Sequence, residues 1–243
     1  MTEQPNGAYV WQSLGQPHDY GQWVHGNLLN LIRRPPQLVL DVGCGLGVNG
    51  GFLKQQFPSC RVMGVEPVRD MALRAEKYLD HVFCCQFENI DLASAGVQPG
   101  EFDLVIFSDV LEHLYHPWQV LQDTKAILSR DGVVLASIPN VRHIKIVDQL
   151  IRGEWNYDRS GVMDITHIRF FTRIGVEKLF SETGYNIDEL TVRIDPELQQ
   201  FVGRIQDHTD GIHLEHCDLK KFKRQDIIEF LVLQFLVRAS PNR

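Results

Sequence analysis

The residues best suited to chemistry in this 243-residue chain begin with a GxGxG cluster at Gly43, with Asp41 two residues before it. The cluster follows an apolar run, and glycine there allows a tight turn and the close approach of a ligand. About 19 residues after the cluster, Glu66 follows a second apolar run, where its carboxylate is suited to accept hydrogen bonds from two ribose hydroxyls. The spacing lacks the last glycine of a dinucleotide fingerprint. The acidic Asp41 favours a ligand with a cationic amino-acid end over a diphosphate. The alternative is a glycine turn that serves strand–helix packing alone, which the position of Glu66 disfavours.

A second set of candidates, Asp109, Glu112 and His113, follows a later apolar run. At helical spacing the three share one face. One interpretation makes Asp109 an N-cap and Glu112 its capping-box partner, and another makes the carboxylates and the imidazole metal ligands. We favour the cap, because it already explains the spacing, and the sequence therefore predicts no metal ion. His113 points either toward a substrate or into protein or solvent, and the pattern leaves both open.

Residues 140–172 have the composition of a binding loop, with aromatic, His and Arg side chains between a predicted strand and a predicted helix. His167 and Arg169 alternate with apolar neighbours, so one side of the segment is expected to be buried. We expect His167 to act as a general base or to contact the substrate, and Arg169 to hold a carboxylate or phosphate. The alternative is that both pin the loop to backbone groups. The other expected substrate contacts are Asn140, His143, Trp155 and Tyr157.

An alternation of strands and helices positions these residues and predicts an α/β fold, with a doubly wound, mostly parallel sheet. Helix N-caps are expected at Asp70 and Thr172. Two late strands without a crossover helix between them, residues 186–194 and 229–239, are expected to be antiparallel. The other strands are expected at 37–42, 61–65, 81–85, 102–107 and 132–138, and the helices at 51–57, 70–79, 110–128, 175–183 and 197–205.

Two adjacent prolines, Pro35 and Pro36, cannot continue a helix and mark a boundary. We therefore expect an N-terminal helical or lid segment at residues 1–36 and one domain at 37–243. Insertions are expected at about 140–172 and 195–228, around a crevice at the carboxyl ends of the strands. The aromatic stretch of residues 1–25 is expected to close over that crevice.

The composition, 44% hydrophobic and 23% charged, is that of an ordinary folded protein and excludes a collagen or a coiled coil. With 24 basic and 31 acidic residues the net charge is −7, so nucleic acid is not an expected partner. No apolar run reaches the ~18 residues of a membrane span, and no signal pattern is present. Five cysteines without a CxxC pair predict reduced thiols and a cytoplasmic location. The His-rich stretch at 208–217 fits none of the tight zinc spacings and is expected to be a solvated loop.

Four motifs in chain order, LDVGCGLG, GVEP, FDLVIFSDVLEHL and GVVLASIPN, are similar to those of class I S-adenosylmethionine-dependent methyltransferases. The resemblance covers about residues 38–192. The motifs SDVLEHL, IPN and THIRFFT further resemble a branch that acts on small molecules, sugars and lipid-linked precursors. The resemblance implies a Rossmann-like seven-stranded sheet with an antiparallel last strand. It also implies S-adenosyl-L-methionine as cofactor and S-adenosyl-L-homocysteine as product.

The same resemblance assigns roles around the crevice. It places Gly43 and Gly45 against the methionine part of the cofactor and Asp41 near the methionine ammonium. It places Glu66 on the ribose hydroxyls. Gln86 stands where the family usually has an acid for the adenine amino group, and an amide oxygen also accepts that bond. The full set of expected cofactor residues is Asp41, Gly43, Cys44, Gly45, Glu66, Pro67, Gln86, Phe87, Ser108 and Asp109.

Methyl transfer from a cationic sulfur is an in-line displacement, so the protein must align the acceptor and remove a proton from a hydroxyl. We expect His113 or His167 to take that proton. The leading hypothesis is O-methylation of a small-molecule, sugar or lipid-linked acceptor. The alternatives are N- or C-methylation of a small metabolite, a cofactor-binding protein without turnover, and a dehydrogenase. The oligomeric state is open and includes a homodimer.

Overall fold

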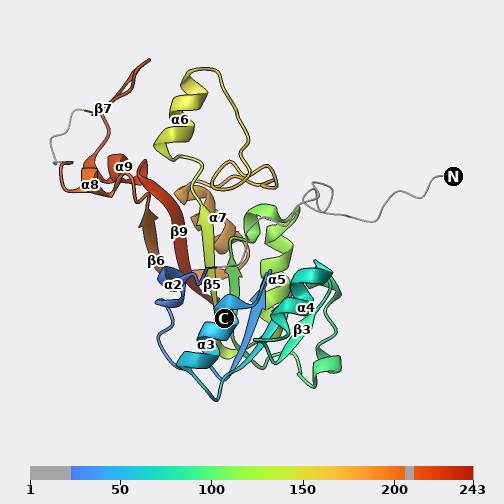
Figure 1. Cartoon of the computed structure of the whole chain (residues 1–243). Helices are drawn as coiled ribbons and strands as arrows, with labels where there is room; N and C mark the ends of the chain where they lie inside the picture. Colours follow the sequence, from blue (N-terminus) through green and yellow to red (C-terminus); the bar gives the residue numbers. More distant parts are fainter. Residues whose placement is uncertain (1–22, 206–210, 243) are drawn as a thin grey trace.

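A computed structural model describes residues 23–205 and 211–242 (Figure 1). Its centre is a seven-stranded sheet with the order β3-β2-β1-β4-β5-β9-β6. Neighbouring strands are parallel except for β9, which runs antiparallel to both β5 and β6. The predicted Rossmann-like fold with an antiparallel last strand is therefore confirmed. The strands are β1 (Leu38–Val42), β2 (Arg61–Val65), β3 (His81–Phe83), β4 (Phe102–Ser108), β5 (Leu128–Pro139), β6 (Tyr185–Ile194) and β9 (Val232–Pro241).

Helices cover both faces of the sheet. Successive residues of a strand point to opposite faces, so the apolar side chains on each face need their own layer of helices to bury them. One buried cluster joins α2, α3 and α4 to strand residues such as Val39, and the other joins α5 and α7 to residues such as Leu40. The two cores hold the sheet rigid, so that its carboxyl edge presents side chains in fixed positions. The helices are α2 (Gly26–Leu29), α3 (Val48–Gln56), α4 (Arg69–Ala75), α5 (Pro117–Ile127), α6 (Ile144–Ile151), α7 (Arg173–Glu182), α8 (Gln199–Val202) and α9 (Arg224–Glu229).

Helix α5 begins later than the sequence pattern predicts. The prediction placed the helix start at residue 110, whereas α5 starts at Pro117, a first position that suits proline because its N–H is not needed there. Leu114 is extended, with a φ of −88° and a ψ of 138°, and so interrupts any right-handed helix that would run from residue 110 into α5. Leu111–His113 instead form a separate 3-10 turn, η3. The prediction that Asp109 caps a helix is therefore wrong, and the capping-box explanation of Glu112 fails with it.

Other boundaries differ in smaller ways. The N-cap of α4 is Val68 in an extended conformation, so Asp70 lies in the first turn and not at the cap. Strand β5 starts at Leu128, before the predicted residue 132, because Leu128 pairs with Phe102 across an irregular register. The predicted helix at 197–205 is reduced to the single turn α8. Thr172 caps α7 as predicted, since its side chain accepts the N–H of Gly175.

The additions to the sheet gather at the carboxyl end of β5 (Figure 1). Helix α6 follows β5 there, and α8, α9 and the short strands β7 (Gly211–His213) and β8 (Asp218–Lys220) belong to the segment before β9. These segments correspond to the two predicted insertions. The predicted lid, residues 1–25, lies almost entirely outside the described residues.

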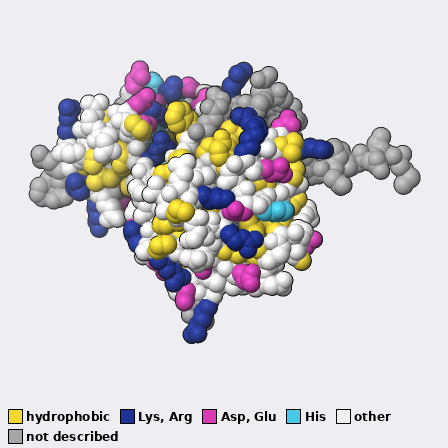
Figure 2. Space-filling view, turned by 60° about the horizontal axis from the view of Figure 1, so that its bottom comes forward, with side chains coloured by type: hydrophobic (Ala, Val, Ile, Leu, Met, Phe, Trp, Pro, Cys, Tyr) yellow, Lys and Arg dark blue, Asp and Glu magenta, His cyan; other side chains and the backbone are white. Residues whose placement is uncertain are grey.

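Two surface features bear on the expected partners. Within residues 23–205 and 211–242, the structure has no helix that is long and apolar enough to cross a membrane. On the face shown in Figure 2, the described Lys and Arg side chains are interspersed with Asp and Glu side chains. That face therefore does not present the clustered cations that a nucleic-acid backbone requires.

Candidate active site

The turn after β1 brings the glycine cluster against the segment that follows β4. Gly43 has a φ of +66°, and a Cβ atom there would lie 2.7 Å from Cγ2 of Val110. Gly45 has a φ of +55°, a conformation that L side chains rarely adopt. The N–H groups of Gly43 and Cys44 donate to the carbonyl of Val65, at 2.8 and 3.1 Å. The turn thus ties together the carboxyl ends of β1 and β2 and contacts the residues after β4.

Glu66 lies at the end of β2 with its carboxylate turned into the glycine turn. Its Oε2 accepts the N–H of Gly45 at 3.0 Å, and its Oε1 accepts the N–H of Val68 at 2.8 Å. Burial raises the pKa of the Glu66 carboxyl, and the two backbone hydrogen bonds act in the opposite direction. Each carboxylate oxygen has a further lone pair, so two ribose hydroxyls can donate to Glu66 without displacing the backbone bonds.

Asp41 is the buried acid of this crevice. Its side chain is 1% exposed, and neither carboxylate oxygen has a hydrogen-bond partner among the described residues. Burial, and then the charge of Glu66, raise the pKa of Asp41 to about 7. An unpaired buried carboxylate is costly, and a cationic ligand group would relieve that cost. The predicted cofactor carries such a cation in its methionine ammonium, so the residues present fit it.

Replacing Asp41 by asparagine is expected to stabilise the unliganded protein at pH 8 and to weaken cofactor binding. The pKa of the Asp41 carboxyl is about 7 in the folded protein and ordinarily 3.8, so as the pH rises this carboxyl ionises first in the unfolded chain. The free energy of unfolding therefore falls as the pH rises from about 4 to about 7. Asparagine removes this penalty, which is ~4 kcal/mol at most. Thermal unfolding of Asp41→Asn and wild type at pH 5 and pH 8 checks the effect, with the exposed Asp70→Asn as control. An equal change in melting temperature at both pH values would contradict the assignment.

The other predicted cofactor residues lie at the carboxyl ends of neighbouring strands. Gln86 precedes and Phe87 begins a 3-10 turn, η1 (Phe87–Asn89), just after β3. The ring of Phe87 lies 6.3 Å from that of Phe107, between centroids. Pro67 follows β2, and Ser108 ends β4. The structure thus brings the ten predicted residues to one edge of the sheet, and their contact with the cofactor remains a prediction.

Asp109 is held in its unusual backbone conformation by two neighbouring strands. Its N–H donates to Oγ of Ser137 at 2.9 Å, and its Oδ1 accepts from Ser137 Oγ at 2.8 Å and from Gln234 Nε2 at 2.6 Å. Its Oδ2 lies 3.9 Å from Nε2 of His25. Sequence reasoning missed Gln234 and His25. The amide of Gln234 within an apolar strand was a usable signal, whereas nothing in the spacing pointed to His25.

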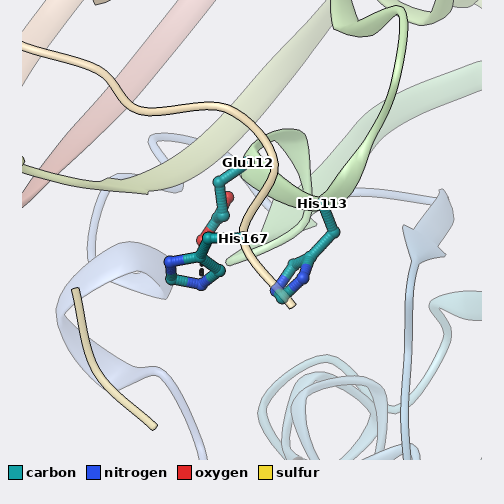
Figure 3. Close-up of side chains that lie close together, drawn as sticks. All are labelled: Glu112, His113 and His167. Carbon is teal, nitrogen blue, oxygen red and sulfur yellow. Dashed lines mark ion pairs between the residues drawn. The ribbon is translucent and has the colours of Figure 1, made fainter. Parts of the chain in front are cut away.

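Glu112, His113 and His167 come together beside η3 (Figure 3). One nitrogen or oxygen atom from each lies within 4.8 Å of the others. Nε2 of His167 is 3.9 Å from Oε1 of Glu112, and the two imidazole rings meet edge to face at 4.7 Å between centroids. The main-chain carbonyl of Glu112 accepts the N–H groups of Ile168 and Arg169, both at 3.0 Å. These two bonds fasten the loop after β5 to η3 and thereby place His167 against Glu112.

Burial controls the charge of this cluster. Glu112 is 1% exposed, and neither of its carboxylate oxygens has a hydrogen-bond partner among the described residues. Burial, and then the charge of Asp109, raise the pKa of the Glu112 carboxyl well above its usual range. Burial, with His167 as a second cause, lowers the pKa of His113 to about 3, and burial also lowers the pKa of His167. Both imidazoles are therefore neutral near pH 7.

Two predicted substrate contacts, Asn140 and His143, instead have structural partners. The amide nitrogen of Asn140 donates to the carbonyls of Glu229 and Val232, both at 2.9 Å, and the side chain is fully buried. Both of its N–H bonds are therefore used. His143 is also buried, with its Nε2 3.3 Å from Oδ2 of Asp195. These contacts hold the loop against the residues around the start of β9. They do not support a contact of either residue with the methyl acceptor.

The remaining loop residues divide into a fastening residue and an exposed aromatic pair. Arg169 donates from Nε to the carbonyl of Tyr115 at 3.2 Å, which fits the loop-pinning alternative, and the predicted anion contact remains a prediction. Trp155 and Tyr157 are 40% and 48% exposed, and Trp155 packs edge to face on Phe170 at 5.3 Å. The aromatic pair therefore keeps accessible surface for a ligand.

Comparison with known proteins places this arrangement in a family. Residues 16–190 match the family model described as a methyltransferase domain. The chain belongs to this methyltransferase domain family. Membership confirms the predicted class, an S-adenosylmethionine-dependent methyltransferase, together with its cofactor. The match covers β1 to β5, the loop that carries His167, and α7.

Individual relatives of the methyltransferase domain are distant. The malonyl-[acyl-carrier protein] O-methyltransferase of Geobacter sulfurreducens is 25% identical over 175 residues, which cover 70% of this chain and 65% of that protein. Across the first four curated relatives, the matched segments span 32% to 65% of the relative's length.

Solved structures share the fold. A SAM-dependent methyltransferase from Thermotoga maritima has a TM-score of 0.59 at 16% identity, and the match covers 89% of this chain and 87% of that one. The 1,6-didemethyltoxoflavin-N1-methyltransferase of Burkholderia thailandensis, solved with bound 1,6-didemethyltoxoflavin and S-adenosylhomocysteine, has a TM-score of 0.56 at 16% identity. That match covers 90% of this chain and 76% of the other.

Proposed function

We propose that this chain transfers the methyl group of S-adenosylmethionine to an oxygen atom of a small metabolite, a sugar or a lipid-linked precursor. The proposal rests on one observation: two candidate sites adjoin each other at the point where Gly43 packs against Val110. On one side lies the acidic glycine turn, and on the other the segment that bears Glu112 and His113. The first suits a cationic nucleoside donor, and the second suits the removal of a proton from a hydroxyl or carboxyl group. The O-methyltransferase name of the Geobacter relative supports oxygen as the acceptor atom.

The glycine turn holds the donor in this proposal. The unpaired carboxylate of Asp41 attracts the methionine ammonium, and Glu66 accepts hydrogen bonds from the ribose hydroxyls. Gly43 and Gly45 let the donor approach the backbone closely. When bound, the cofactor supplies a methyl group on a cationic sulfur, which is already activated. The chain therefore has to orient the donor and exclude water.

The cluster after β4 handles the acceptor. His113 and His167 are neutral near pH 7, so each has a lone pair that can receive the acceptor's proton, and the pKa of about 3 makes His113 the weaker base of the two candidates. The finer prediction of a small-molecule or sugar branch rests on SDVLEHL and THIRFFT, the two motifs that supply this cluster. The exposed Trp155 and Tyr157 are suited to cover an acceptor. The proposal includes a cytoplasmic location, which the five free cysteines support.

N-methylation is the second candidate, because the Burkholderia neighbour is named an N1-methyltransferase. A neutral imidazole would serve there by accepting a proton from the attacking nitrogen. The two candidates share the donor site and differ in the acceptor atom.

The test is the transfer of a deuterated methyl group from S-adenosylmethionine to a panel of alcohols, phenols, carboxylic acids and amines. The expected products are methyl ethers or methyl esters, identified by mass spectrometry. Products methylated at nitrogen alone would replace O-methylation by N-methylation. Donor binding without any methylated product would favour the alternative of a cofactor-binding protein without turnover.

A further inference from the structure

We propose that Glu112, His113 and His167 bind one divalent first-row transition-metal ion. This inference goes beyond the proposed methyl transfer, and it reverses the expectation from sequence that no metal ion is present. The three residues are the one group of at least three His, Cys, Asp or Glu side chains with ligand spacing that residues 23–205 and 211–242 contain. Figure 3 shows the three side chains converging from η3 and from the loop that crosses it.

The donor set and its spacing fit such an ion. Two imidazole nitrogens and one carboxylate are ligands that first-row divalent metals prefer, and a set of three leaves coordination positions open. An ion bound at roughly 2.1 Å from each ligand requires ligand atoms no more than about 4.2 Å apart. The Nε2 atom of His167 and Oε1 of Glu112 are already 3.9 Å apart, and the widest separation in the group is within 4.8 Å. Small side-chain adjustments therefore complete the site.

In both histidines, the ring nitrogen Nδ1, which would face away from the ion, contacts a main-chain carbonyl, as is common for metal-bound histidines. Nδ1 of His167 lies 3.0 Å from the carbonyl of Val162, and Nδ1 of His113 lies 3.2 Å from the carbonyl of Thr166. A carbonyl accepts a hydrogen bond, so each Nδ1 carries the proton and the lone pair lies on Nε2. Metal-bound histidines commonly donate their second ring N–H in this way, which fixes the ring and the tautomer. Thr166 is itself held, because its hydroxyl donates to Asp164 at 2.6 Å.

Glu112 provides the independent observation. Both of its carboxylate oxygens are buried and lack a hydrogen-bond partner among the described residues, and the side chain is turned toward the two imidazoles. Buried carboxylates are normally paired, hydrogen-bonded or bound to a metal. The capping-box pairing that would have satisfied Glu112 does not exist, because α5 starts at Pro117. The buried helices and strands around the cluster supply no Lys or Arg partner to Glu112 in the described part of the chain. A divalent cation satisfies this carboxylate and uses the imidazole lone pairs beside it.

Within the proposed function, the ion would also have a role. The cluster lies on the segment that packs against the glycine turn, so an acceptor hydroxyl could occupy an open coordination position near the donor. A hydroxyl bound to a divalent ion would lose its proton more readily. With the ion bound, the Nε2 lone pairs of His113 and His167 would be on the metal, so the proton would go to solvent water and neither imidazole would act as the base. This role rests on the proposed function, whereas the binding of the metal does not.

The test is a titration of the full chain, stripped of metal by a chelator, with Co²⁺ alone. Calorimetry and the visible absorption of the protein-bound ion report binding without any methyl donor. We expect about one tight Co²⁺ per chain, and an affinity lower on the order of 100-fold in Glu112→Gln, His113→Ala and His167→Ala. The double variant His213→Ala/His216→Ala is the matched control, since it removes two exposed histidines elsewhere. It should bind Co²⁺ as the wild type does.

Glu112→Gln decides the outcome, because glutamine keeps the size of the side chain. Circular dichroism confirms its fold, and added Co²⁺ should raise the melting temperature of the wild type and not that of Glu112→Gln. The absence of tight binding by the wild type would overturn the proposal. Unchanged binding by a folded Glu112→Gln, or loss of binding in the surface double variant, would also overturn it. Metal binding without methyl transfer would leave this inference intact and count against the proposed function.

Discussion

Replacing Glu66 by alanine should weaken the binding of S-adenosylmethionine about 100-fold, because hydrogen bonds to a charged group contribute roughly 1.5–3 kcal/mol each. The variant loses the acceptor for the ribose hydroxyls, and it also releases the N–H groups of Gly45 and Val68, which Glu66 now holds at 3.0 and 2.8 Å. The glycine turn then loses its fixed shape as well as its charge. Isothermal titration calorimetry with the wild type and Glu66→Ala measures the change.

Glu76→Ala is the matched control for this experiment, because it removes the same charge at an exposed position at the end of α4. It should bind the cofactor as the wild type does. Thermal unfolding of both variants separates a loss of affinity from a loss of fold. A folded Glu66→Ala with wild-type affinity would show that the ribose lies elsewhere.

The second large effect is expected at the cluster after β4. His113→Ala and His167→Ala should each lower kcat by about 100-fold or more, the usual contribution of a positioned proton acceptor, whether it acts directly or through a bound ion. Cofactor affinity should change little, because the ring contact between the two histidines and their hydrogen bonds to Thr166 and Val162 hold both side chains against the loop after β5. Turnover with the best acceptor of the panel and calorimetry with the donor measure the two quantities separately.

His216→Ala serves as control, since His216 is exposed in the segment before β9. It should keep full turnover. If both cluster variants also keep full turnover, the cluster does not handle the acceptor's proton. A parallel loss of donor affinity and turnover would instead assign the histidines to the donor site.

The features of the fold and of the donor site that follow from local sequence or from strand order were predicted correctly. The glycine turn follows from Gly43 and Gly45 alone, because their positive φ values are a property of one short segment. Glu66 was found from its distance along the chain, since a parallel strand returns to the same edge of the sheet. The antiparallel β9 was predicted because the sequence shows no obvious crossover helix between the last two strands, and the two helices found there, α8 and α9, are short.

The pairing of distant segments could not be read from spacing. The i, i+3 and i+4 spacing of Asp109, Glu112 and His113 suggested a helix cap. In the structure, Oδ1 of Asp109 instead accepts hydrogen bonds from Ser137 and Gln234, which are distant in the sequence. His167 reaches Glu112 through two backbone hydrogen bonds made by a loop after β5.

For the residues of that loop, the sequence alone also did not reveal which side chains are already paired within the fold. Asn140 and Trp155 both looked like ligand contacts in sequence, and burial and hydrogen bonding separate them. Side-chain type predicts what a residue can bind, whereas its partners in the fold decide whether that capacity is already used.

Calorimetric titration of the full chain with S-adenosylmethionine, and separately with NAD, tests the central claim most directly. We expect about one molecule of S-adenosylmethionine per chain, no binding of NAD, and a marked loss of affinity in Glu66→Ala and Asp41→Asn. Binding of NAD without S-adenosylmethionine, or undiminished binding of S-adenosylmethionine by both folded variants, would contradict the assignment of the acidic glycine turn as the donor site.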